Sequence, residues 1–260
     1  MKTDQKNYYE GTDQLESEGT LINDLKEGAW KWYYPNGMLK NKGIYKGGEP
    51  NGPFYYYHEN GQESANGTYR GEKREGDWVW TFDTGITNQY GHYVDGELDG
   101  PYHWFHPTGE PSTTGAFLKG QRHGDWIWQN PNGAVVHQIA YDAGKMHGLN
   151  QKYSGDGSRT EYIKNYHQGA LHGPFGLLGT DENVTEKGNY VMGKKHGEYY
   201  NLVKGKLKKS EFDYGVPLLT EKKWQSIAKQ LAKKKDNYAK MDLLDKHCDY
   251  SAKVNMLWYM

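Results

Sequence analysis

Hydrophobic and polar positions along the chain repeat every 24 residues, and one glycine marks each unit. These glycines are Gly28, Gly52, Gly76, Gly100, Gly124, Gly148, Gly173 and Gly197. Every step between them is 24 residues, apart from one of 25. Self-similarity at a fixed period of this size is typical of repeat architectures, in which each unit is covered by its neighbours. The chain is therefore predicted to be an array of about eight repeats.

Within each unit, the pattern predicts two strands joined by a tight turn. Aromatic residues alternate along the first strand, which places Trp30 and Trp32 on one face. The same spacing pairs Phe54 with Tyr56, Trp78 with Trp80, Tyr102 with Trp104, and Trp126 with Trp128. An Asn-Gly or related dipeptide follows, as at Gly37, and favours a hairpin because glycine adopts positive φ. A second aromatic run, such as that around Tyr45, completes the hairpin. We expect the paired rings to form the core and the glycines to serve the turns.

Three segments follow from where this pattern begins and ends. Residues 1–27 are predicted to be an N-terminal tail and a degenerate capping half-repeat, and residues 28–216 to hold the hairpin repeats. In residues 217–260, Trp224, Ile227 and Leu231 recur with helical spacing, which predicts an amphipathic capping helix and a tail. The predicted fold is all-β, an elongated antiparallel sheet of about 16 strands with this helix at its end.

Composition narrows the setting in which the chain acts. The formal net charge is −1, with 32 Lys and Arg against 33 Asp and Glu, so no global attraction to nucleic acid is expected. The first residues lack the apolar segment of a signal peptide, and no apolar run reaches about 18 residues. Cys248 is the single cysteine, which leaves no intrachain disulfide. These features predict a cytoplasmic protein.

Histidines are the first candidates for a metal or catalytic site. His123, His147, His172 and His196 each precede a repeat glycine. Equivalent positions in adjacent hairpins lie about 9.6 Å apart, whereas two nitrogens on one zinc ion are separated by at most about 4.2 Å. We therefore expect these histidines to be polar turn residues that bond nearby backbone, and we predict no metal and no cofactor.

The remaining reactive groups lack a catalytic arrangement. Cys248 and His247 are adjacent on the predicted helix, where their directions diverge by about 100°. Asp77 and Asp125 share a repeat position but lie about 19 Å apart at the spacing of the strands. No catalytic residue is predicted, and an uncharacterised enzyme is the least favoured of three hypotheses.

Two surfaces are candidates for binding. The face opposite the Trp pairs carries Tyr33, Tyr55, Tyr57, His103 and Phe105, which are predicted to bind a partner protein because aromatic side chains supply large contact area at low entropic cost. The alternative is partial burial of these side chains against a fold of the sheet. The predicted helix carries Lys222, Lys223, Lys229, Lys233, Lys234 and Lys235, a basic face that either binds anionic phospholipid or is simply solvated.

The repeat unit resembles a known family. Gly-x-Trp-x-Trp, the Asn-Gly turn, Gly-x-Tyr and links such as Gly193-Lys-Lys-His-Gly197 resemble the MORN repeat over roughly residues 11–215. The 24-residue spacing is closer to the variant in bacterial antitoxins of the YwqK type. The chain departs from the usual Tyr-x-Gly-x-Trp order of the MORN repeat. The resemblance implies a hairpin array and a non-enzymatic protein-binding module, in its most concrete form an antitoxin or immunity protein that neutralises a toxin. A membrane-associated scaffold is the alternative.

Overall fold

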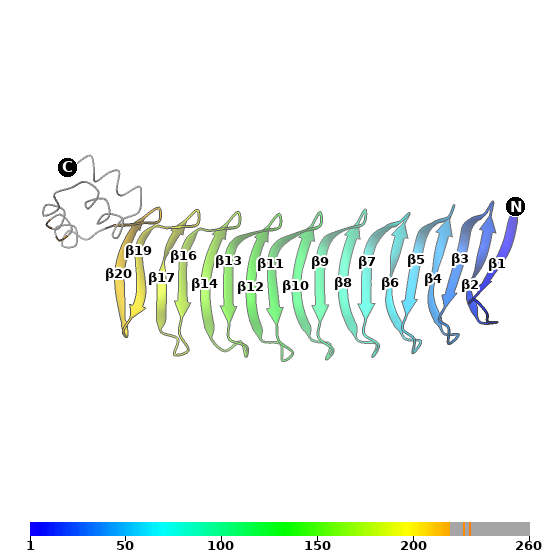
Figure 1. Cartoon of the computed structure of the whole chain (residues 1–260), viewed down its shortest axis with the longest axis horizontal. Helices are drawn as coiled ribbons and strands as arrows, with labels where there is room; N and C mark the ends of the chain where they lie inside the picture. The colour runs from blue at the N-terminus through cyan, green and yellow to red at the C-terminus, as the bar shows by residue number, and fades with distance from the viewer. Residues whose placement is uncertain (219–225, 227–228, 230–260) are drawn as a thin grey trace. The chain divides into compact units, whose positions relative to one another are not determined.

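A computed structural model of the protein describes residues 1–218, 226 and 229, and every regular element within residues 1–218 is a β-strand (Figure 1). These residues divide into two compact units. The first comprises Met1–Lys145 with Gly155–Gly157, and the second comprises Met146–Ser154 and the chain from Ser158 onward. Within each unit, strands consecutive in the chain pair antiparallel as stacked hairpins. The all-β hairpin array predicted from the 24-residue period is therefore confirmed.

The strands of the first unit are β1 (Lys2–Tyr8), β2 (Leu15–Ile22), β3 (Leu25–Tyr33), β4 (Leu39–Lys46), β5 (Glu49–Tyr57), β6 (Glu63–Arg70), β7 (Lys73–Thr81), β8 (Thr87–Val94), β9 (Glu97–Phe105), β10 (Pro111–Leu118), β11 (Gln121–Gln129) and β12 (Val135–Asp142). The strand β13 (Lys145–Tyr153) begins at the boundary. The second unit continues with β14 (Thr160–His167), β15 (Ala170–Leu171), β16 (Gly173–Leu178), β17 (Val184–Val191), β18 (Lys194–Lys195), β19 (Gly197–Val203), β20 (Lys206–Asp213) and β21 (Val216–Leu218).

The described residues form 21 strands, whereas about 16 were predicted, and the ends of the array explain much of the difference. The predicted tail forms β1, which pairs with β2, although it has neither the glycine nor the tryptophans of a repeat. Breaks at His172 and His196 divide two first strands into short pieces. The strand β21 includes Pro217 and Leu218, which the sequence placed at the start of a helix. Apart from residues 226 and 229, the rest of that predicted helix lies outside the described residues.

A column of first-strand side chains forms the core. In the first unit its members are Trp30, Phe54, Trp78, Tyr102 and Trp126, which are at most 8% exposed. In the second unit they are Asn150, Phe175 and Tyr199. The second member of each predicted pair is less buried, and Trp104 is 46% exposed. The pairs do share a face, but only the first ring of each pair is fully covered by the neighbouring strands.

Glycines on the second strands make room for these rings. Gly43 and Gly67 do not adopt positive φ, and a β-carbon at either position would overlap the ring of Phe54 or Trp78 respectively. The ring lies flat against the backbone of the preceding strand, where no side chain fits. The expectation that the glycines serve turns is therefore wrong for these positions, and it holds for the hairpin glycines such as Gly37, whose φ is 86°.

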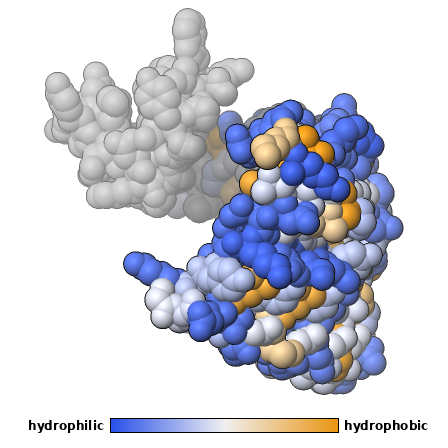
Figure 2. Space-filling view, turned by 90° about the vertical axis from the view of Figure 1, so that its right-hand side faces the viewer, coloured by the Kyte–Doolittle hydropathy of each residue, from blue (hydrophilic) through white to orange (hydrophobic). Residues whose placement is uncertain are grey.

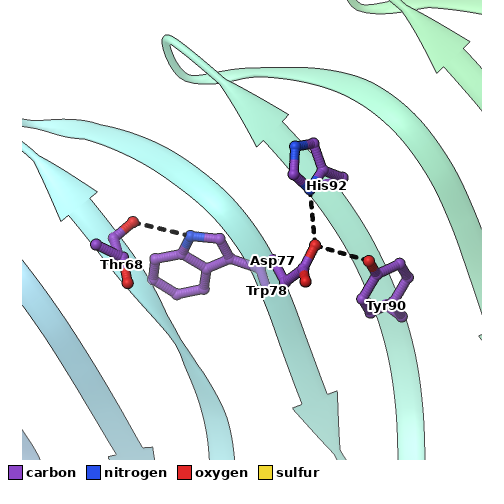
Figure 3. A network of polar contacts seen from close by, with 5 residues as sticks. All are labelled: Thr68, Asp77, Trp78, Tyr90 and His92. Carbon is purple, nitrogen blue, oxygen red and sulfur yellow. Dashed lines mark hydrogen bonds and ion pairs between the residues drawn. The ribbon is translucent and has the colours of Figure 1, made fainter.

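Two kinds of repeat alternate in the first unit, with a combined period of 48 residues. We name the repeats that begin with β3, β7 and β11 Trp-type, because they carry Trp-x-Trp. In these repeats each buried indole donates a hydrogen bond to the preceding strand, for example from Trp78 Nε1 to the Thr68 carbonyl at 3.1 Å (Figure 3). We name those that begin with β5 and β9 Pro-type, because Pro53 and Pro101 follow their repeat glycines.

The two kinds differ in backbone as well as in side chains. Gly52 and Gly100 precede the prolines and have φ of 133° and 125°, whereas Gly76 has φ of 69°. A proline disfavours the helical region for the residue before it, so the Pro-type glycines are pushed toward extended conformations. The alternation is thus a property of the fold, since the same 24-residue repeat accommodates two backbone conformations at its first glycine.

Hydrogen bonds join neighbouring repeats at both ends of the strands, in the hairpin turns and in the links. At the hairpin turns, the hydroxyl of Tyr34 donates to the Tyr57 carbonyl at 2.8 Å, and a nitrogen of His58 lies 2.9 Å from the Thr81 carbonyl. At the links, the amide of Gly48 donates to the Lys26 carbonyl at 2.9 Å. Both contacts span close to one repeat, so they fix the spacing between hairpins independently of the aromatic column.

Candidate functional site

All five predicted partner-binding residues lie on the sheet face opposite the aromatic column. Tyr33 is in β3, Tyr55 and Tyr57 are in β5, and His103 and Phe105 are in β9. Each side chain is partly buried. Because β5 and β9 are two hairpins apart, the two aromatic pairs are separated by about 19 Å. The structure therefore divides the predicted site into separate clusters rather than one patch.

The first cluster surrounds Tyr55 and Tyr57. Lys42 lies opposite Tyr55 in the register of β4 and β5. Its ammonium nitrogen is 4.9 Å from the centre of the Tyr55 ring and 5.9 Å from that of Tyr57. An ammonium group above two tyrosine rings is a favourable cation-π arrangement. This cluster thus presents a positive charge beside two aromatic rings.

Tyr33 belongs to a polar cluster of its own. Its hydroxyl donates to a carboxylate oxygen of Glu18 at 2.7 Å, and Lys31 lies 3.6 Å from the same oxygen. Burial, together with the hydrogen bond to Glu18, raises the pKa of Tyr33 to about 12. The hydrogen bond from Tyr33 is the main cause that lowers the pKa of Glu18. Tyr33 is therefore held in place by an intrachain partner, unlike a freely available contact residue.

The third cluster forms a shallow hollow of about 480 Å³ lined by Val79, Thr87, Tyr90, Pro101, His103 and Phe105. The ring centres of Tyr90 and His103 are 5.7 Å apart, and those of His103 and Phe105 are 6.2 Å apart. Sequence reasoning missed Tyr90. A signal was present, because the same repeat position holds Lys42, Asn66 and Thr114, so an aromatic residue there is unusual.

A hydrogen-bonded carboxylate orients one wall of this hollow (Figure 3). Asp77 accepts a hydrogen bond from the Tyr90 hydroxyl at 2.7 Å, and the same oxygen lies 2.7 Å from His92 Nδ1. The bonds from His92 and Tyr90 lower the pKa of Asp77, and the bond to Asp77 raises the pKa of Tyr90. These shifts make Asp77 a weaker base and Tyr90 a weaker acid. The network thus favours a positioning role for Asp77 over proton transfer.

The histidines before the repeat glycines do not lie in turns as predicted, because His123 is in β11, His147 is in β13, and His172 and His196 lie at breaks between short strands. His172 Nδ1 accepts a hydrogen bond from the Met192 amide at 3.4 Å, and His123 and His196 lie 3.6 Å and 3.4 Å from the carboxylates of Asp142 and Asp213. The predicted backbone contact is confirmed for His172. At the same repeat position Glu27 accepts from the Gly47 amide at 2.8 Å.

Histidines at non-equivalent positions lie close together in the second unit. His167 lies between His147 and His172, with ring centres 4.8 Å and 5.5 Å away. Within residues 1–218, 226 and 229, however, no group of three or more His, Cys, Asp or Glu side chains has an arrangement suited to a metal ion.

Several residues named from the sequence lie in the C-terminal part of the chain, beyond Leu218. His247, Cys248 and the lysines proposed for membrane contact lie outside the described residues, except for Lys229, which is exposed. In the part of the chain that the structure describes, no helix has the length and apolar character needed to span a membrane. In the view of Figure 2, hydrophilic residues cover most of the surface, and hydrophobic residues form small separate patches.

Comparison with known proteins adds no assignment. The sequence matches no known family profile and no curated protein.

Proposed function

We propose that the protein is a non-enzymatic binding module that recognises another protein through the face opposite its aromatic column. The observation that carries this proposal is the hollow between Val79 and Phe105, which is lined in part by three aromatic side chains and whose Tyr90 is oriented by Asp77. Aromatic side chains held in a fixed orientation bind partners well because little conformational entropy is lost on contact. The Tyr55 and Tyr57 cluster provides a second anchor on the same face.

The spacing of the two aromatic pairs suits an extended interface. A standard interface buries about 800 Å² on each partner. A hairpin occupies about 9.6 Å along the sheet, and a nine-residue strand is about 30 Å long, so three repeats offer about 860 Å². The repeats from Tyr55 to Phe105 therefore provide the area of one interface, with an aromatic pair at each end.

The resemblance to MORN repeats and to antitoxins of the YwqK type supports a specific version of this proposal. In that version the partner is a toxin, and the protein neutralises it by covering its surface. The resemblance rests on the repeat motifs alone, so the role as an antitoxin is an extension of the binding proposal.

Affinity capture from the native host tests the proposal. The full chain is expected to retain one dominant partner, identified by mass spectrometry, and the double variant Tyr57→Ala, Phe105→Ala is expected to lose it. Leu25 and Leu118, which are 51% and 45% exposed, provide a matched control when both are changed to Ala. Circular dichroism and thermal unfolding establish that each variant is folded. Equal capture by the aromatic and control variants would reject this face as the binding surface.

A further inference from the structure

The Trp-type repeats show how this fold accommodates a cation. In each of them a basic side chain from the start of the first strand lies across three aromatic rings. Arg74 lies 4.9 Å from the ring centre of Trp78, 5.3 Å from Trp80 and 5.4 Å from Tyr93. Arg122 and Lys26 make the equivalent three contacts in their repeats, at 4.5–5.9 Å and 4.8–5.0 Å respectively.

The Pro-type repeat that begins with β9 has the rings without the cation. Tyr102, Trp104 and Phe117 occupy the positions of Trp78, Trp80 and Tyr93, and Leu98 occupies that of Arg74. The Tyr102 ring centre is 5.9 Å from Trp104 and 5.2 Å from Phe117, so the cluster is intact. Within the described residues, no basic side chain lies over the Trp104 ring.

Leu98 cannot replace the missing cation. Its side chain packs down against Gly91, where a β-carbon would lie 2.9 Å from Leu98 Cδ2. A leucine in that position is too short to cross the rings as Arg74 does. As a result Trp104 is 46% exposed, whereas Trp80 is partly buried. Trp104 is nevertheless held in place, because its Nε1 donates to the Gln89 side-chain oxygen at 2.8 Å.

The other Pro-type repeat, which begins with β5, differs from this one in the cation that lies near its rings. Its rings, Phe54, Tyr56 and Tyr69, also lack a cation of their own, since Pro50 takes the position of Arg74. The guanidinium of Arg74 in the next repeat, however, interacts electrostatically with the hydroxyl groups of Tyr69 and Tyr56. The corresponding residue near Trp104 is Arg122, whose guanidinium is 4.5 Å from Trp126 in its own repeat and whose charge acts on Tyr102. Phe117, at the position of Tyr69, has no hydroxyl that could draw Arg122 over the Trp104 ring.

We propose that the Trp104 ring, bordered by Tyr102 and Phe117, binds the guanidinium of an arginine side chain from a partner protein. The Trp-type repeats show which group fits such a cluster of rings, because two of the three cations at this repeat position are arginines. A planar guanidinium stacks on indole better than an ammonium group does. This site is on the face opposite the hollow of Val79 and Phe105, so it stands independently of the binding surface proposed above.

Indole N–H resonances of the full chain measure this interaction directly. The probe is N-acetyl-arginine amide, with N-acetyl-citrulline amide as a neutral control of the same shape. The resonance assigned by its loss in Trp104→Phe is expected to shift saturably with the arginine probe. Binding of the citrulline probe is expected to be about two- to fivefold weaker, because citrulline keeps the shape and loses the charge.

Two variants that exchange arginine and leucine at this repeat position provide the decisive test. Leu98→Arg supplies an internal guanidinium and is expected to abolish the response of Trp104 to the probe. Arg74→Leu is expected to create a second responding indole, that of Trp80. Equal binding of the two probes to the unaltered protein would overturn the proposal without reference to any variant. An undiminished Trp104 response in folded Leu98→Arg would also overturn it.

Discussion

The Trp-type and Pro-type repeats share one backbone frame, yet only the first strands of the Pro-type repeats carry an aromatic pair on each face of the sheet. The Trp-type repeats bury a tryptophan beneath a basic side chain and carry Val79 and Thr81, or Ile127 and Gln129, on the opposite face. The Pro-type repeats carry the aromatic pairs of that face and leave Trp104 exposed.

This difference indicates that stability and binding are assigned largely to different repeats of the first unit. The Trp-type repeats combine a ring that is 1–2% exposed, an indole hydrogen bond and a cation, which together stabilise the stack. The buried rings of the Pro-type repeats, Phe54 and Tyr102, have no indole N–H, and these repeats carry the exposed Trp104 and the aromatic pairs of the opposite face for which we propose binding. A binding residue in such an array does not have to stabilise its own repeat, because the neighbouring repeats on both sides stabilise that repeat.

Truncation of the core rings should show the largest contrast between the two kinds. Trp78→Ala is expected to lower the free energy of unfolding by about 4 kcal/mol, since a fully buried ring is replaced by a cavity. Trp104→Ala should cost about 1.5 kcal/mol because nearly half of its side chain is already exposed. Urea unfolding followed by circular dichroism measures both. Equal losses would mean that the two repeats are equally important for stability.

The glycines beneath the rings provide the next contrast. Gly67→Ala is expected to cost about 3 kcal/mol, because its β-carbon overlaps the indole of Trp78, which has no space to move. Gly91→Ala meets the end of the Leu98 side chain at 2.9 Å and the Tyr102 ring at 3.4 Å, and should cost about 1 kcal/mol. The same unfolding measurement applies. A smaller loss for Gly67→Ala than for Gly91→Ala would contradict the ring-on-glycine packing.

Exchange of the basic and apolar residues should have a smaller effect on stability. Arg74→Leu is expected to lower the free energy of unfolding by about 1 kcal/mol, the size of a partly exposed cation-π contact. Leu98→Arg should change it by less than about 1 kcal/mol, since the aliphatic stem of arginine covers the apolar surface that Leu98 covers now. Thermal unfolding of the two variants and of the double exchange distinguishes these effects. A strongly destabilised Leu98→Arg would show that the two repeats are not interchangeable at this position.

The smallest expected effect concerns the opposite face of the first Trp-type repeat. The pKa of Tyr33 is raised from 10.0 to about 12, so folding favours the neutral phenol. This contribution to stability is complete below about pH 10 and is lost as the pH rises through about 12. In Glu18→Gln the pKa of Tyr33 should fall part of the way, because burial, the larger cause, remains.

Absorbance of tyrosinate at alkaline pH measures this change, and Tyr33→Phe identifies the signal. An unchanged high-pH phase in Glu18→Gln would show that the carboxylate does not influence Tyr33.

Much of the architecture followed from the spacing of residues. The 24-residue period, the alternation of Trp30 and Trp32, and the turn glycines such as Gly37 were sufficient to predict stacked hairpins, since strand periodicity and turn chemistry are local properties. The same alternation predicted that Tyr55 and Phe105 lie on the face opposite the aromatic column. Within the second unit, however, the decay of the repeat concealed the breaks at His172 and His196.

Contacts between strands were decided only by the tertiary structure. Register determines that Trp78 lies on Gly67, that Tyr90 faces His103, and that Leu98 packs on Gly91 away from Trp104. These partners are separated along the chain by seven to thirteen residues, and a bulge in the pairing changes which side chains meet. A one-dimensional pattern specifies the face on which a side chain lies, whereas its burial depends on what the next strand places against it.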